Sequence, residues 1–441
     1  MQYDLTEGNI TKNLLKFALP LMAGNLLQQF YNVADTWIVG RFLGADALAA
    51  VGSSYTLMVF LTSILLGLCM GSGAFFSMQF GKKDFDRMKN GFFLSFLLIG
   101  AVTLLLSVIV YLGMDIILAF MRVPSEVRPM MQEYLLYVFT GIFATFLYNY
   151  FANLLRAVGN SVVPLIFLAV CALLNVALDL LFVLVFHWGV KGAAIATALS
   201  QYVSGIGILV YYYLGFPHLR IKKAHMRWDI SILKDIAGLS TLTCLQQSVM
   251  NLGILMVQGL VNSFGTAVMA AFAAAVKIDS FAYMPVQDFG NAFSTFIAQN
   301  YGAGKKDRVR RGMRSAAVTA AVFSVAVALL VCLFARPLMG LFVDGSRVDI
   351  IAIGVGYLRI EASFYFGIGL LFLFYGYYRA ISKPGVSVVL TVISLGTRVA
   401  LAYLLSAIPQ IGVTGIWVSI PIGWILADLT GAALLKRYSL S

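Results

Sequence analysis

The chain alternates between long apolar runs and short polar or charged connections. Each of twelve runs exceeds the roughly 20 residues that an α-helix needs to cross a bilayer. The runs lie near residues 14–40, 47–78, 91–120, 130–155, 162–186, 190–215, 232–263, 267–299, 312–335, 350–378, 385–408 and 411–435. This pattern predicts an all-α integral membrane protein with twelve transmembrane helices.

Composition supports the membrane prediction. Hydrophobic residues make up 61% of the 441 residues and charged residues only 11%, whereas soluble domains carry roughly 25% charged residues. So few polar side chains cannot cover the surface of a water-soluble fold, and the remaining apolar surface is expected to face membrane lipids. The four cysteines (Cys69, Cys171, Cys244 and Cys332) all lie inside apolar runs and are interpreted as small packing residues.

The net charge of +12 is explained by topology. Most basic residues lie in the connections on one side of the predicted helices. The other side holds Arg41, Arg122, Arg128, Lys191, Arg336 and Arg347, and the apolar runs themselves contain Lys277, Arg359 and Arg398. The positive-inside rule then places both termini in the cytoplasm. No nucleic-acid partner is needed to account for the charge.

The two halves of the sequence repeat each other. Leu27-Gln28-Gln29 recurs as Leu245-Gln246-Gln247, Tyr134-Leu135 as Tyr357-Leu358, and Arg156-Ala157 as Arg379-Ala380. Six spans per half is an even number, so the halves are predicted to enter the membrane in the same orientation, related by a pseudo-two-fold axis along the membrane normal. The predicted division is an N-terminal lobe at 1–218, a cytoplasmic linker at 219–230 and a C-terminal lobe at 231–441. Parallel repeats are typical of transporters that rock two bundles about a central cavity, although a duplicated channel would also contain them.

Polar side chains gather in three spans of the first half. Asn25, Gln28, Asn32 and Asp35 share one face of the first predicted helix, because they recur every three or four residues. Asn175 and Asp179 are one turn apart in the fifth span, and Thr197 lies one turn beyond Ala193 in the sixth. A carboxylate at membrane depth costs about 2.5–3.5 kcal/mol on insertion scales, so such residues are expected to be functional.

The second half lacks this polar set. Gly253, Arg398, Ala402 and Ile420 stand opposite Asp35, Asn175, Asp179 and Thr197. Two carboxylates, an amide and a hydroxyl suit a hard monovalent cation such as Na⁺. The same two carboxylates could instead share one proton, because neighbouring like charges repel each other. A hydrogen-bonded polar plug without any ligand is the remaining alternative.

Several stretches carry a resemblance to a known family. They include Gln28-x-x-Tyr31-Asn32-x-x-Asp35, Gly189-Val190-Lys191-Gly192-Ala193-Ala194 and Gln299-Asn300-Tyr301-Gly302-Ala303-Gly304. In these residues the chain resembles the multidrug and toxic compound extrusion (MATE) transporters of prokaryotic plasma membranes. The resemblance implies two six-helix lobes around a central cavity, and export of amphipathic, often cationic, organic compounds in exchange for Na⁺ or H⁺. It implies no enzyme activity and no cofactor beyond the coupling ion, and we expect a monomer.

The resemblance also implies roles for individual residues. A cation site would consist of Asp35, Asn175, Asp179 and Thr197, with Ala193 offering its carbonyl group. Pro20 stands where some members have a helix-bending proline. Further candidates for the substrate cavity or its gate are Gln28, Tyr31, Asn32, Gln246 and Lys277. The NorM-like branch places a coupling carboxylate on the seventh helix, where this chain has Gln246 and Gln247, so coupling through the first lobe is favoured.

Charged residues at membrane depth also occur in the second half. They are Lys277, Asp279, Asp288, Glu361 and Arg398. We interpret them as ion pairs that lock the second lobe, with Lys277 and Arg398 supplying the cations. Contact with substrate in the cavity is the alternative.

The favoured function is therefore secondary antiport. The absence of a G-x-x-x-x-G-K-[ST] loop gives no support for ATP as the energy source. A lipid-linked precursor flippase of the wider superfamily is an alternative, but twelve spans and an acidic first lobe argue against it. A membrane-embedded enzyme would need a nucleophile–base pair or metal ligands at depth, and no histidine lies at the centre of a span.

Overall fold

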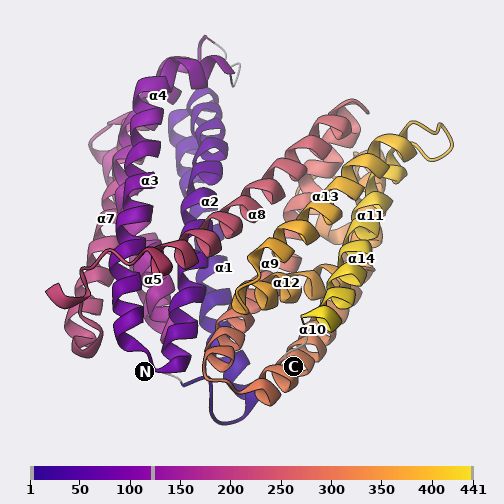
Figure 1. The fold of residues 1–441 in the computed structure, drawn as a ribbon. Helices are drawn as coiled ribbons and strands as arrows, with labels where there is room; N and C mark the ends of the chain where they lie inside the picture. Colours follow the sequence, from indigo (N-terminus) through magenta and orange to yellow (C-terminus); the bar gives the residue numbers. More distant parts are fainter. Residues whose placement is uncertain (1–3, 121–124, 439–441) are drawn as a thin grey trace. The chain divides into compact units, whose positions relative to one another are not determined.

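The computed structural model describes residues 4–120 and 125–438, and its regular structure is helical throughout this part of the chain (Figure 1). The first half contains α1 (Ile10–Leu43), α2 (Ala45–Lys82), α3 (Phe85–Phe120), α4 (Arg128–Val138), α5 (Ile142–Ala157), α6 (Val162–Leu180) and α7 (Gly189–Gly215). The second half contains α8 (Ile230–Asn262), α9 (Thr266–Gly302), α10 (Lys306–Gly340), α11 (Val348–Ala362), α12 (Tyr365–Ala380), α13 (Pro384–Ser406) and α14 (Val413–Arg437). Arg122, assigned above to a connection, lies outside the described residues.

The predicted all-helical membrane fold is confirmed. Within the described residues, ten helical stretches are long and apolar enough to cross a membrane, and the bent pair α11–α12 would be an eleventh span. The remaining helix, α1, is 34 residues long but carries the polar stripe that ends at Asp35, which lowers its hydropathy. With α1 included, the helices correspond to the twelve predicted apolar runs.

One span in each half departs from regular α-helix at an equivalent place. Between α4 and α5 the backbone forms a 3₁₀ turn at Phe139–Gly141, and α11 meets α12 at an angle of 51°. The Thr140 hydroxyl donates to the Tyr137 carbonyl at 2.6 Å, and the Ser363 hydroxyl donates to the Arg359 carbonyl at 2.6 Å. Such bonds from a side chain to its own helix often accompany bends. The sequence repeat therefore extends to the local backbone.

The contacts divide the chain into two compact units. Ala23–Cys244 form most of unit 1, whereas Leu5–Met22 and Leu245–Ser441 form unit 2. This division differs from the lobes predicted from the repeat, because the first part of α8 belongs to unit 1 and the first part of α1 belongs to unit 2. Pro20 lies inside α1, just before its passage from one unit to the other, where a missing backbone N–H weakens the helix.

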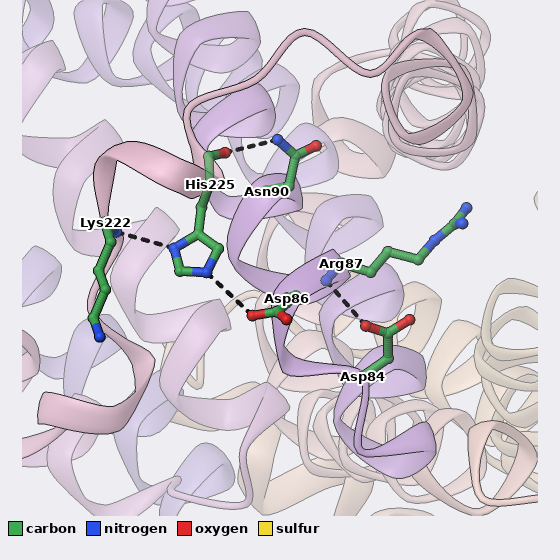
Figure 2. A network of polar contacts seen from close by, with 6 residues as sticks. All are labelled: Asp84, Asp86, Arg87, Asn90, Lys222 and His225. Carbon is green, nitrogen blue, oxygen red and sulfur yellow. Dashed lines mark hydrogen bonds and ion pairs between the residues drawn. The ribbon is translucent and has the colours of Figure 1, made fainter.

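In unit 1 the segment that leads into α8 is fastened to α3 (Figure 2). The Asn90 side-chain amide donates to the carbonyl groups of His225 at 2.7 Å and Arg227 at 2.8 Å. The His225 ring accepts from the Lys222 backbone N–H through Nδ1, and its Nε2 lies 3.1 Å from an Asp86 carboxylate oxygen. Asp86 and Asn90, which are one turn apart on α3, therefore hold the segment from which α8 begins.

Unit 2 contains a corresponding attachment for the segment before α1. The Leu5 backbone N–H donates to the Gln299 side chain at 3.2 Å, and the Asn300 amide donates to the Leu5 carbonyl at 3.1 Å. The Arg308 guanidinium donates to the carbonyl groups of Glu7 at 2.6 Å and of Gly8 at 2.7 Å. The Gln299-Asn300 pair, noted above as part of a family-like stretch, thus has a structural role at the end of α9.

Candidate functional site

Small residues bring α7 close to α6 in unit 1. A Cβ atom at Gly192 would lie 3.1 Å from the Cβ atoms of Phe182 and Trp188, so a larger side chain there would push the helices apart. Ala193 and Ala194, which follow, are completely buried. The end of α6 continues into a short π-helical segment, Leu181–Val185, a distortion that is frequent at functional sites. This close approach places Thr197 of α7 beside α6.

Asn175 and Thr197 form the polar link between the two helices. The Asn175 amide donates to the Thr197 hydroxyl oxygen at 3.3 Å, and the Thr197 hydroxyl donates to the Ala193 carbonyl at 3.1 Å. Because Asn175 uses its NH₂ group in this link, its carbonyl oxygen is left for another partner. Ala193 is therefore part of the cluster, but its carbonyl already accepts one hydrogen bond.

The two carboxylates complete the cluster. Asp179, fully buried one turn after Asn175 on α6, lies close enough to Asp35 of α1 for the two carboxyl groups to interact directly. Asp35 Oδ1, Asn175 Oδ1 and both carboxylate oxygens of Asp179 are buried without a hydrogen-bond partner. Buried polar atoms normally have partners, and an uncompensated buried charge is strongly unfavourable. Four acceptor oxygens without a donor are suited to a cation or to protons.

Tyr134 of α4 belongs to this cluster, although sequence reasoning assigned it no role. It is buried, its hydroxyl interacts with Thr197, and it lies near both Asp35 and Asp179. The recurrence of Tyr134 as Tyr357 in the second half could have indicated a role beyond packing. An aromatic residue in an apolar run is, however, usually a packing residue. Tyr134 adds a hydroxyl group to the polar side chains around the two carboxylates.

The polar stripe of α1 continues from this cluster toward α2. Tyr31 lies near Asp35, Gln28 and Tyr55, and the Asn32 amide is 3.5 Å from the Tyr55 hydroxyl. Gln28 is exposed. Tyr55 of α2, to which the sequence alone gave no role, thus extends the polar stripe of unit 1 onto a second helix.

The remaining predicted residues lie in unit 2. Pro20, Gln246 and Lys277 therefore do not belong to the unit that contains the carboxylate cluster. Lys277 is exposed and takes part in none of the ion pairs found among the described residues. Asp288 is buried on α9. Among the described residues, Lys277 therefore forms no ion pair, and the prediction that it supplies a cation to such a pair is wrong. Arg398, the other predicted cation, lies near Asp279 and Glu361.

A family model provides the decisive comparison. The MatE model matches residues 20–181 and 242–404, which is one matched segment in each half of the chain. The chain belongs to the MatE family. Both segments begin within the entry helix of their half and end within its fifth span, as the internal repeat requires.

Curated relatives and solved structures agree with this assignment. The "Probable multidrug resistance protein YpnP" of Bacillus subtilis is 32% identical over 440 residues, covering 99% of this chain and 97% of its own. The "Multidrug export protein MepA" of Staphylococcus aureus is 24% identical and covers 99% of this chain and 96% of its own. An outward-facing MATE family multidrug resistance transporter has the same fold, with a TM-score of 0.92, 23% identity and 100% coverage of both chains.

Replacing Thr197 by Val in this MatE protein tests the cluster without changing its charge. Valine has the shape of threonine but removes the acceptor for Asn175 and one oxygen of the predicted cation site. Since one neutral hydrogen bond contributes about 0.5–1.5 kcal/mol, we expect the half-saturating concentration of the coupling ion to rise about threefold to tenfold. Transport measured against Na⁺ concentration and pH checks this. Thr197→Ser keeps the hydroxyl and should behave like the parent, and an unchanged ion dependence in Thr197→Val would exclude Thr197 as a ligand.

Proposed function

We propose that this MatE protein is a secondary antiporter that exports small organic compounds in exchange for Na⁺ or H⁺. The observation that carries the proposal is the group of four buried, donor-free oxygens of Asp35, Asn175 and Asp179. The names of the relatives, which include a multidrug export protein and a multidrug resistance protein, support drug-like substrates. Amphipathic cations are the substrate class that we propose.

The coupling would follow from the charge of the cluster. Without a ligand, two neighbouring carboxylates repel each other in a medium that screens charge poorly. A bound cation or proton removes this repulsion, and so favours the access state in which the carboxylates are close together. A ligand shifts a conformational equilibrium only by its difference in affinity between the two states. The acidic pair would supply that difference, with Asn175 and Thr197 positioning the ligand.

The proposed location is a prokaryotic plasma membrane, with both termini on the cytoplasmic side. The placement of the basic residues supports this orientation. Attachment of the segments before α1 and α8 by Arg308, Lys305, Asn90 and neighbouring polar residues is consistent with an aqueous environment at these ends of the helices.

Transport by the purified protein in liposomes tests the proposal. A fluorescent amphipathic cation is followed first under an imposed Na⁺ gradient at equal pH, and then under a pH gradient without Na⁺. We expect one gradient to drive movement of the dye against its own concentration gradient, and an ionophore that collapses that gradient to stop it. Failure of both gradients, or movement of a labelled lipid-linked sugar in their place, would contradict the proposal.

A further inference from the structure

Unit 2 contains a second buried acidic cluster, on α9 and α11. Asp279 accepts hydrogen bonds from the hydroxyl groups of Tyr365 at 2.6 Å and Tyr357 at 3.3 Å. Glu361 is 1% exposed, and neither of its carboxylate oxygens has a hydrogen-bond partner. One acid of this cluster is therefore well satisfied by neutral donors, whereas the other has none.

The cation of this cluster is Arg398 of α13. Its charge is close enough to act on both Asp279 and Glu361. In the part of the chain that the structure describes, no direct ion pair joins Arg398 to either acid, and its Nε is buried without a partner. Electrostatic attraction between buried charges extends beyond contact distance, because the protein interior screens them weakly. Tyr283 also lies near this group of charges.

The repeat relates this cluster to the one in unit 1. Arg398 occupies the position that Asn175 has in the first half, and Tyr357 occupies the position of Tyr134. In both units, then, a tyrosine of the fourth span and a polar residue of the fifth span lie near two carboxyl groups. The difference is that unit 1 has no basic side chain in its described cluster, whereas unit 2 has a guanidinium, which stays charged at every physiological pH.

We propose that Arg398 is a tethered counter-cation that takes, in unit 2, the place that an exchangeable ion has in unit 1. Its permanent positive charge offsets one of the two acidic charges, as a bound monovalent ion or a proton would in unit 1, so that unit 2 binds no coupling ion. Calling the ion of unit 1 a coupling ion rests on the proposed function, but the charge balance within unit 2 does not.

The proposal predicts that removing the charge of Arg398 turns the acidic cluster of unit 2 into an ion-binding site. In a background of Asp35→Asn and Asp179→Asn, which silences the cluster of unit 1, Arg398 is replaced by Asn, the residue of the first half at this position. Thermal unfolding of the detergent-solubilised full chain is measured with increasing NaCl against choline chloride, and across pH. We expect Arg398→Asn to gain a saturable rise in Tm of at least about 2 °C with Na⁺ or with protons. The background itself and Arg398→Lys, which keeps the charge, should not gain it.

A second variant separates charge balance from packing. Glu361→Gln with Arg398→Asn removes one acid and one cation together, so it should abolish the ion-dependent rise and restore folded yield if Arg398→Asn alone folds poorly. A folded Arg398→Asn protein whose Tm does not rise with Na⁺ or protons would overturn the proposal. So would an ion-dependent rise in Tm in the background that retains Arg398. If Arg398→Asn alone does not fold, a Glu361→Gln plus Arg398→Asn protein that folds no better would also overturn it. None of these outcomes depends on transport, so a failed antiport assay leaves them interpretable.

Discussion

Replacing Asp179 by Asn is expected to reduce ion-driven efflux to nearly that of protein-free liposomes, and Asp35→Asn should do the same. Asparagine keeps the size of the side chain but removes one of the two charges that would attract the proposed coupling ion. Its NH₂ group would also donate to the remaining carboxylate, which has lacked a donor, and so imitate the ligand-bound state. Allosteric coupling energies of about 1–3 kcal/mol correspond to affinity changes of about 5- to 150-fold, so the loss of ion-driven efflux should be readily measurable in proteoliposomes.

The matched control is an aspartate outside the cluster. Asp115 of α3 has a side chain that is 78% exposed and pairs with Arg128 at 3.0 Å. Exposed ion pairs contribute little, so Asp115→Asn should transport normally. Size-exclusion profiles establish that all three variants remain folded. Undiminished efflux in both Asp35→Asn and Asp179→Asn would remove the cluster from the coupling mechanism, whereas substrate binding that persists without efflux would support it.

The helical spans could be predicted because length and apolar composition determine them. The 3₁₀ turn at Phe139–Gly141 and the bend between α11 and α12 could not, since neither falls at a proline or at the end of an apolar run. The division into units also escaped prediction. A repeat shows which segments are equivalent, but not that the start of α1 packs with the second half or that the start of α8 packs with the first.

The candidate cluster was predictable where polar residues interrupt an apolar span. Asn175, Asp179 and Thr197 were identified in this way, and the structure brings them together with Asp35. Tyr134 and Tyr55 were not identified, because a tyrosine in an apolar run has no pattern that separates a polar contact from packing. Lys277 was assigned an ion pair from its depth in the sequence alone, but depth along the chain does not determine which way a side chain points.

A glycine pair on α2 determines how closely α8 can approach within unit 1. Gly67 and Gly71 are one turn apart, a spacing that allows close helix packing in membranes. A Cβ atom at Gly71 would lie 2.5 Å from the Leu239 carbonyl oxygen and the Ser240 Cα, and one at Gly67 would lie 2.6 Å from the Cys244 Cα. These are backbone atoms, which cannot move aside as a flexible side chain can. The Ser72 and Ser240 hydroxyl groups, 2.9 Å apart, depend on the same approach.

Gly71→Val is therefore expected to force α8 away from α2 and to abolish transport. It should lower the free energy of unfolding by about 3 kcal/mol, which is at the upper end of typical overpacking costs. The effect on transport should be large because α8, like α1, passes from one unit to the other. Gly52→Val is the matched control, since it lies on the same helix and a Cβ there meets nothing within 4 Å. Thermal unfolding and efflux of the two variants are compared directly. Equal stability and equal efflux would mean that the approach of α8 to α2 can relax without cost, and that the first part of α8 is not held by this interface.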